Sequence, residues 1–313
     1  MQKQREKRLS HEHRQDAAMG FRLWLAIALN LGIASAELIG GFLGGSIALL
    51  ADSVHNFGDV GTLTLAAVAR NLGARPPSLR HTYGFKRFEV FAALINVIVL
   101  AAATALLLRE SLFRLLHPAR INSTLTIVVA CVAFGANSLS ILLLRVHEKH
   151  DLNLRAAVLH LMQDAVSSVV VIAVGFLSNT RVGHYADSLA AVAIGGAILF
   201  GVGSILRQVM RTLLEGAPVH IDVAELVRRS ELHFNIRFHH VHVWEVGPGQ
   251  CALTAHLLVR DMKVREAEEL CGEVRDFLRE NWGIQHVTLE PEVMGCGSEE
   301  VLGTWNTETV TAD

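Results

Sequence analysis

The chain has 313 residues, of which 51% are hydrophobic and 19% are charged, and its formal net charge is −2. Few soluble domains combine so many apolar residues with so few charged ones. The nearly neutral charge, with no block of like charges, argues against a protein that binds nucleic acid. Because the apolar residues are concentrated in the first two thirds, the sequence predicts a membrane part followed by a soluble part.

The first 20 residues are charged and hydrophilic, which is typical of a cytosolic tail and too polar for a signal peptide. Six apolar segments follow, each long enough for a helix of about 20 residues that crosses a bilayer. They are residues 21–43, 45–69, 89–109, 123–145, 154–178 and 186–207. We therefore expect a six-helix transmembrane domain over 21–210. Basic residues gather in the tail and after the second and fourth segments, which predicts that both termini are cytoplasmic.

The pattern changes after residue 210. Residues 211–295 alternate amphipathic helical spacing with β-rich stretches, in the order α-β-β-α-β. This order predicts a small cytosolic α+β domain, with two helices on one face of a sheet. Residues 296–313 lack periodicity and are predicted to be a disordered tail. The four cysteines form no C-x-x-C pair, so we expect reduced thiols that are mostly buried.

Two of the apolar segments carry the same polar pattern. His55 and Asp59 are four residues apart in the second segment, and His160 and Asp164 repeat this spacing in the fifth. Residues i and i+4 lie on one face of a helix, so two such helices offer two nitrogens and two oxygens, a set that suits tetrahedral zinc. An ionised Asp in mid-membrane costs about 2.5–3.5 kcal/mol, which favours a binding site. The alternative is that each pair forms only a helix–helix hydrogen bond.

Such a site also suggests a mechanism. Zinc binds neutral imidazole and carboxylate, so loading releases protons and protonation releases the metal. A site that opens alternately to the two faces of the membrane would therefore exchange zinc for protons.

Five stretches together resemble the cation diffusion facilitator family, in its zinc-exporting branch of bacterial type. They are GGSIALLADSVHNFGD, HTYGFKRFEVFAALIN, LNLRAAVLHLMQD, LLEGAP and HVHVWEV with the strands after it. The resemblance covers residues from about 20 to 293. It implies a homodimer in the inner (plasma) membrane, with six membrane helices and a copper-chaperone-like cytosolic domain per subunit. The implied activity is divalent-metal/proton antiport that exports Zn²⁺ from the cytoplasm by alternating access.

The resemblance also implies roles for particular membrane residues. His55, Asp59, His160 and Asp164 would form the transport site, and the histidine at position 55 would favour zinc over cadmium. Asp52 lies outside the usual tetrad and is expected to support it. Two further expectations concern the edge of the membrane domain. Arg87 and Glu215 match a charge pair; the alternative is that both simply lie at the level of the lipid headgroups. His81 is expected to be an exposed loop histidine, because Ser78 and Phe85 replace the ligands that accompany it in some relatives.

In the cytosolic part, His239, His256 and Glu292 match positions that carry metal in several family members. Glu269 and Glu290 fall at further positions that are histidine in one pattern, so a site with more oxygen ligands is expected. Its implied role is regulatory, at the dimer interface; the alternative is that these histidines are simply solvated. Four other histidines are expected on the surface, and the alternative is that they deliver zinc to the entrance: His11, His13, His147 and His150.

Three other functions are compatible with polar residues in a membrane. An intramembrane metallohydrolase needs an open coordination position and typically an H-E-x-x-H motif, which this sequence lacks, so we expect no enzyme. A passive metal channel and a membrane-bound metal sensor remain as alternatives. Glu37, Asn96 and Asn137 are expected to form hydrogen bonds between helices.

Overall fold

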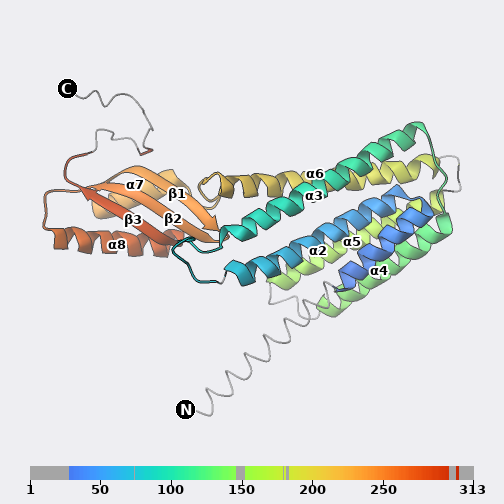
Figure 1. The fold of residues 1–313 in the computed structure, drawn as a ribbon, viewed down its shortest axis with the longest axis horizontal. Coiled ribbons are helices and arrows are strands. Elements are labelled where there is room, and N and C mark those ends of the chain that lie inside the picture. Colours follow the sequence, from blue (N-terminus) through green and yellow to red (C-terminus); the bar gives the residue numbers. More distant parts are fainter. Residues whose placement is uncertain are drawn as a thin grey trace, which may run out of the picture. The chain divides into compact units, whose positions relative to one another are not determined.

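Figure 1 shows the computed structural model of the protein. It describes residues 28–73, 75–145, 152–178, 180, 183–295 and 301–302. The expectations for the tail 1–20, for His11, His13, His147 and His150, and for most of the tail 296–313 lie outside the described residues. The chain divides into two compact units, residues 1–68 with 93–206 and residues 69–92 with 207–313, and each unit is described by itself.

The first unit is a bundle of helices (Figure 1). Its elements are the helix Ala28–Gly44, α2 (Ile47–Gly73), α3 (Arg87–Leu116), α4 (Ser123–Arg145), α5 (Leu152–Leu177) and α6 (Gly183–Leu213). The end of α2 after residue 68, the start of α3 up to residue 92 and the end of α6 from residue 207 belong to the second unit. Four of them, α3 to α6, contain stretches long and apolar enough to cross a membrane. Helix α2 is as long as these, but its apolar run is interrupted by Asp52, His55, Asn56 and Asp59.

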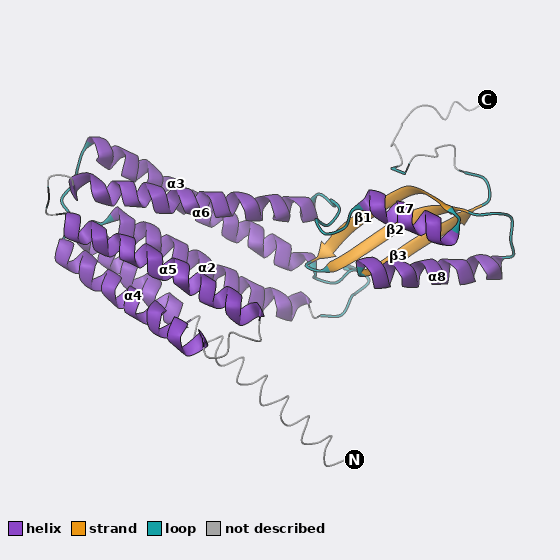
Figure 2. Ribbon diagram, turned by 180° about the vertical axis from the view of Figure 1, so that it is seen from behind, coloured by secondary structure: helices purple, strands orange, loops and turns teal. Residues whose placement is uncertain are grey.

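Small residues allow the helices of this unit to pack closely. Ala48 and Ala51 of α2 belong to one buried cluster with Ala130 of α4 and Ala191 of α6, and α3 and α6 form a second cluster around Val97. Large apolar side chains point outward instead, as lipid contact requires, and Leu106, Phe42 and Phe200 are 66%, 71% and 80% exposed. Figure 2 shows α2, α4 and α5 side by side and α3 beside α6.

The start of α2 is held by another helix. The chain turns at Gly45, with φ of +70°, and Asp187 of α6 then accepts three hydrogen bonds: from Ser46 Oγ at 2.6 Å, from the backbone N of Ile47 at 2.8 Å and from that of Ala48 at 3.3 Å. The Asp187 side chain is only 4% exposed. It satisfies the free N–H groups at the beginning of α2, and its negative charge suits the positive end of the helix dipole.

The second unit contains a three-stranded sheet and two helices. Its elements are α7 (Val223–Phe234), β1 (Arg237–Gly247), β2 (Gln250–Leu258), α8 (Val264–Trp282) and β3 (Ile284–Glu292). The strand order is β1-β2-β3, with β1 antiparallel and β3 parallel to β2. This arrangement confirms the predicted order α-β-β-α-β and the small α+β fold.

Alternation along the strands gives the sheet a core face and an open face. Leu253 and Leu257 of β2 are fully buried and share a cluster with Leu226 of α7 and with Val274 and Leu278 of α8. Thr254 and His256 lie between them in sequence, so they point to the opposite face, which we call the open face.

Two cysteines belong to this core. Cys251 and Cys271 are buried and free, and burial raises the pKa of both thiols. Both are therefore protonated at neutral pH, as expected of reduced structural cysteines. Cys131 of α4 is exposed instead.

The contacts of Asp187 lead to a prediction about stability. In Asp187→Asn, an amide NH₂ replaces one of the two accepting oxygens, so at least one buried donor at the start of α2 loses its partner. We expect a loss of about 1–3 kcal/mol, measured as a lower melting midpoint of the purified protein in detergent. Asp261→Asn, which changes an exposed acid before α8, is the matched control, and equal midpoints for the two variants would contradict the assigned cap.

Candidate metal sites

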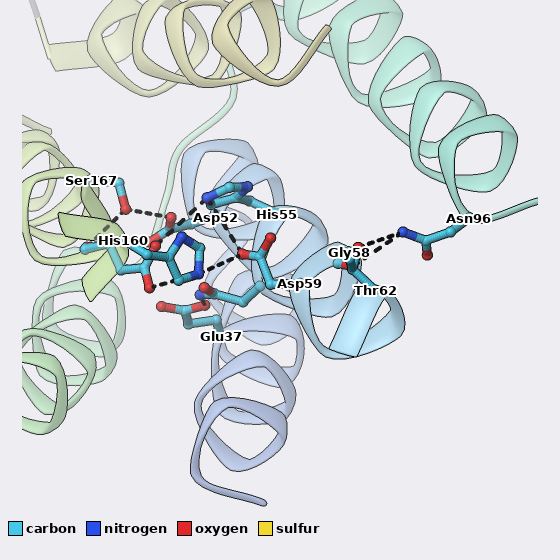
Figure 3. A network of polar contacts seen from close by, with 11 residues as sticks. Glu37, Asp52, His55, Gly58, Asp59, Thr62, Asn96, His160 and Ser167 are labelled. Atoms are coloured by element: carbon cyan, nitrogen blue, oxygen red, sulfur yellow. Dashed lines mark hydrogen bonds and ion pairs between the residues drawn. The ribbon is translucent and has the colours of Figure 1, made fainter. Parts of the chain in front are cut away.

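Helices α2 and α5 bring the four predicted membrane ligands together. One ligand atom from each of His55, Asp59, His160 and Asp164 lies within 4.8 Å of the others. Figure 3 shows His55, Asp59 and His160 pointing toward one another from their two helices. The structure therefore places both His-x-x-x-Asp faces toward a shared centre. Metal binding at this centre stays a prediction.

Each histidine of the tetrad lies between two carboxylates, one on its own helix and one on the other. His55 Nε2 is 3.6 Å from oxygens of both Asp59 and Asp164. His160 Nε2 is 3.3 Å from Asp59 Oδ2 and 3.7 Å from Asp164 Oδ2. All four separations exceed the usual range of an N–H···O hydrogen bond, the shortest of them only slightly.

The carboxylates of the tetrad lack ordinary hydrogen-bond donors. Asp164 is 2% exposed, and neither of its carboxylate oxygens has a hydrogen-bond partner among the described residues; the same holds for Asp59 Oδ2. Buried acceptors without donors are uncommon in folded proteins, because each costs free energy unless a proton or a cation satisfies it. The histidines are more accessible, with side chains 31% and 35% exposed, so the centre is not sealed.

Asp52 joins the same two helices beside the tetrad. It is 1% exposed, and Ser167 Oγ of α5 donates a hydrogen bond of 2.5 Å to its Oδ1. Asp52 is not in the group of ligand atoms that share the centre, which agrees with a supporting role. Ser167 could not be predicted from the sequence, because a serine in a helix has no pattern that reveals its partner.

Further polar residues connect the helices around this centre, as predicted for Glu37 and Asn96. Asn56 Nδ2 donates a hydrogen bond of 2.7 Å to Glu37 Oε2, and Asn96 Nδ2 of α3 donates one of 2.9 Å to Thr62 Oγ1 of α2. Asn137 is buried too, at 2% exposed. Asp187 was also missed, although the sequence holds a signal for it. It is an acidic residue inside a predicted span, and unlike Asp59 and Asp164 it has no histidine four residues away that could pair with it.

A second group of potential ligands lies on the open face of the sheet. His239 Nε2 is 3.1 Å from Glu292 Oε2, and His256 Nδ1 is 2.6 Å from Glu292 Oε1. Glu290 lies at the exposed edge of this group: its Oε2 is 3.6 Å from His256 Nε2, and its side chain is 69% exposed. Glu269 is not in the group; in this chain it pairs with Arg265 on α8.

A β-bulge determines which histidines of β1 share the open face. His239 pairs with His256 and His242 with Thr254, so three residue steps on β1 match two on β2. The extra residue lies around His240, which has a φ of +49°. In a regular strand His239 and His242 would point to opposite faces, but the bulge places both on the open face.

The predicted charge pair at the edge of the membrane domain is present. Arg87 Nη2, at the start of α3, donates a hydrogen bond of 2.9 Å to Glu215 Oε1, just after α6. The side chains are 43% and 64% exposed, so in water such a pair contributes little, about 1 kcal/mol or less. His81 lies in the exposed loop before α3, where its ring packs against Phe85 with centroids 4.6 Å apart.

Comparison with known proteins identifies the family. Residues 23–214 match the cation efflux transmembrane domain, and residues 220–293 match the cation efflux protein cytoplasmic domain. The chain therefore belongs to the cation efflux family, whose members are membrane transport proteins and not enzymes. The resemblance to cation diffusion facilitators, and the helical membrane domain followed by a cytosolic α+β domain, are confirmed.

The relatives cover most of the chain. It is 34% identical to the zinc transporter ZitB of Escherichia coli, over 88% of each chain. It is 31% identical to the metal cation efflux system protein CzcD of Cupriavidus metallidurans, over 95% of this chain and 94% of CzcD. A third relative, from Bacillus velezensis, is described as a cadmium, cobalt and zinc/H(+)-K(+) antiporter and is 29% identical over 91% of this chain and 92% of its own.

Proposed function

We propose that this protein exports divalent cations, chiefly zinc, from the cytoplasm in exchange for protons, with His55, Asp59, His160 and Asp164 as the transport site. The observation that carries the proposal is the centre between α2 and α5, where these four side chains converge around buried oxygens for which the described residues supply no hydrogen-bond donor. The names of the relatives, which include zinc transporters, support zinc as the transported ion.

The spacing of the four ligand atoms supports a tetrahedral cage. Zinc lies about 2.0–2.2 Å from nitrogen and oxygen ligands, so neighbouring ligands of a tetrahedral zinc are about 3.3–3.5 Å apart. The four nitrogen–oxygen separations are 3.3, 3.6, 3.6 and 3.7 Å, where His55 is measured to Oδ1 of Asp164 and His160 to its Oδ2. They lie close to the distances of a zinc cage and beyond those of a direct hydrogen bond, so the alternative of two helix–helix hydrogen bonds is less well supported.

Proton coupling follows from the ligand chemistry. Imidazole and carboxylate bind zinc only when they have released their protons. Zinc binding to the transport site is therefore favoured on the side of the membrane with higher pH, and protons on the more acidic side displace the ion. An inward proton gradient would drive zinc outward through this cycle, whereas a passive channel or a sensor would show no opposing proton movement.

The remaining parts of the proposal concern topology and assembly. The protein would be a homodimer in the inner (plasma) membrane with both termini in the cytoplasm, as the basic loop from Arg75 to Arg87 supports. Its proposed parts are the cytosolic tail 1–20, the membrane domain 21–210, the regulatory and dimerisation domain 211–295, and the tail 296–313.

We assign a regulatory metal site to His239, His256 and Glu292, with Glu290 as a further ligand. One carboxylate contacts two imidazoles, so three potential ligands of one cation already lie close together. The carboxylate oxygens favour weaker zinc binding than an all-histidine set would. Metal bound there would stabilise one arrangement of the cytosolic domains in the dimer and so regulate metal transport through the membrane domain.

Removing a carboxylate from the tetrad tests the transport site. Asp59→Asn and Asp164→Asn each remove a charged ligand, and we expect zinc-driven proton flux in reconstituted vesicles to fall more than about 100-fold. Glu110→Gln on α3, which removes a half-exposed carboxylate that pairs with Arg114, should leave the flux unchanged. Full activity in both tetrad variants would exclude the assigned site, and zinc uptake without proton movement would favour the channel.

A substitution at position 55 tests the selectivity for zinc over cadmium. Aspartate is shorter than histidine and replaces a nitrogen ligand with oxygen, so His55→Asp should leave room for a larger ion. We expect this variant to keep zinc transport and to raise the ratio of cadmium to zinc transport, measured by competition between the two ions in vesicles. An unchanged ratio would show that this histidine does not set the metal preference.

The cytosolic site is tested in a protein whose transport site has been disabled. In the Asp59→Asn/Asp164→Asn background, Glu292→Gln should weaken the remaining zinc binding about 10–100-fold, measured by competition with a chelator. Glu273→Gln, which removes an exposed acid of α8, serves as the matched control. Equal zinc affinity in the two variants would mean that Glu292 is not a ligand.

A further inference from the structure

A cavity of about 900 Å³ lies in the second unit between the loop before α3 and the open face of the sheet. The loop contributes residues 80–85, and the sheet contributes His242, Trp244 and Thr254. The cavity is separate from the group formed by His239, His256 and Glu292, none of which lines it.

Two contacts hold the loop against the sheet, and a third ties the start of α3 to the segment after α6. The backbone of Lys86 lies so close to Gly247 that a Cβ on this glycine would be 2.9 Å from the Lys86 oxygen. The ring of Tyr83 meets that of His286 on β3, with centroids 5.8 Å apart, and Arg87 bonds to Glu215. The cavity is therefore a feature of the folded unit and not a gap beside an unattached loop.

The lining of the cavity combines positive charge with an apolar wall. Arg87 is neutralised by Glu215, whereas Arg80 is exposed and forms no ion pair with any acid in the part of the chain described. Phe88, Phe91 and Trp244 line the same space. This combination complements a molecule with an anionic group next to a hydrocarbon part.

The apolar wall belongs to a helix that enters the membrane. Phe88 and Phe91 lie in the first two turns of α3, a helix long and apolar enough to cross a membrane, and they are 38% and 52% exposed. Aromatic and basic residues gather where such helices meet lipid headgroups, and basic pockets on the cytoplasmic side bind anionic headgroups. A free phosphate ion would gain nothing from the aromatic wall.

We propose that this cavity binds an anionic phospholipid, with Arg80 contacting the phosphate and with Phe88 and Phe91 packing against the glycerol and the upper acyl chains. The proposal goes beyond metal transport and needs only that α3 spans the bilayer. The bound lipid would connect the loop, the start of α3 and the open face of the sheet, since all three line the cavity.

The test compares two arginines of one loop. Arg75 is exposed like Arg80 but does not line the cavity, so Arg75→Gln removes the same charge without altering the site. Full-length protein in detergent is titrated with phosphatidylglycerol or phosphatidylcholine, and bound lipid is counted by native mass spectrometry. We expect Arg80→Gln to weaken phosphatidylglycerol binding about tenfold or more, Arg80→Lys to retain most of it, and Arg75→Gln to leave it unchanged.

A second measurement examines the apolar wall. Phe91→Ser should reduce the affinity for phosphatidylglycerol. Glycerophosphoglycerol, which has the same phosphodiester headgroup without acyl chains, should compete poorly with the lipid in the unaltered protein. Equal weakening by Arg75→Gln and Arg80→Gln would indicate general attraction to a charged surface and overturn the proposal. Strong competition by glycerophosphoglycerol, or a loss of dimer mass in Arg80→Gln without loss of bound lipid, would also overturn it.

Discussion

The membrane domain depends on the cost of placing charged groups in hydrocarbon. A carboxylate in mid-membrane must find a proton, a cation or several hydrogen-bond donors, and α2 and α5 each carry such groups on one face. Turning these faces toward each other brings all four side chains to one centre. The same constraint explains why the neighbouring helices supply Glu37, Asn96 and Asp187 to partners on α2.

Two buried aspartates illustrate the difference between an acid that supports the fold and one suited to a ligand. Asp187 and Asp164 are nearly equally buried, at 4% and 2% exposed. Asp187 accepts three hydrogen bonds, whereas neither carboxylate oxygen of Asp164 has a donor among the described residues. Burial alone therefore does not distinguish the two roles, and the number of donors around each carboxylate does. Asp52, which accepts a bond from Ser167, resembles the supporting kind.

The sequence predicts what depends on local periodicity and misses what depends on contacts between distant segments. Apolar runs revealed the helices of the membrane domain, and the four-residue spacing of His160 and Asp164 revealed a polar face. The cap that Asp187 forms on α2 joins residues 140 positions apart, so no local pattern contains it. Likewise, the bulge at His240 depends on how β1 pairs with β2, and regular alternation would have assigned His239 and His242 to opposite faces.

The attachment of Asp187 to the first residues of α2 also constrains how that helix can move. A rigid helix that is held at its first residues can only rotate about them, and the displacement of each residue grows with its distance from that point. At about 1.5 Å per residue, His55 lies about 12 Å from Ile47, and Val68 about 32 Å from it. A tilt that shifts the His55 ring by one ångström would therefore shift Val68 by almost three, so α2 would act as a lever that converts a small adjustment around an ion into a larger one at its far end.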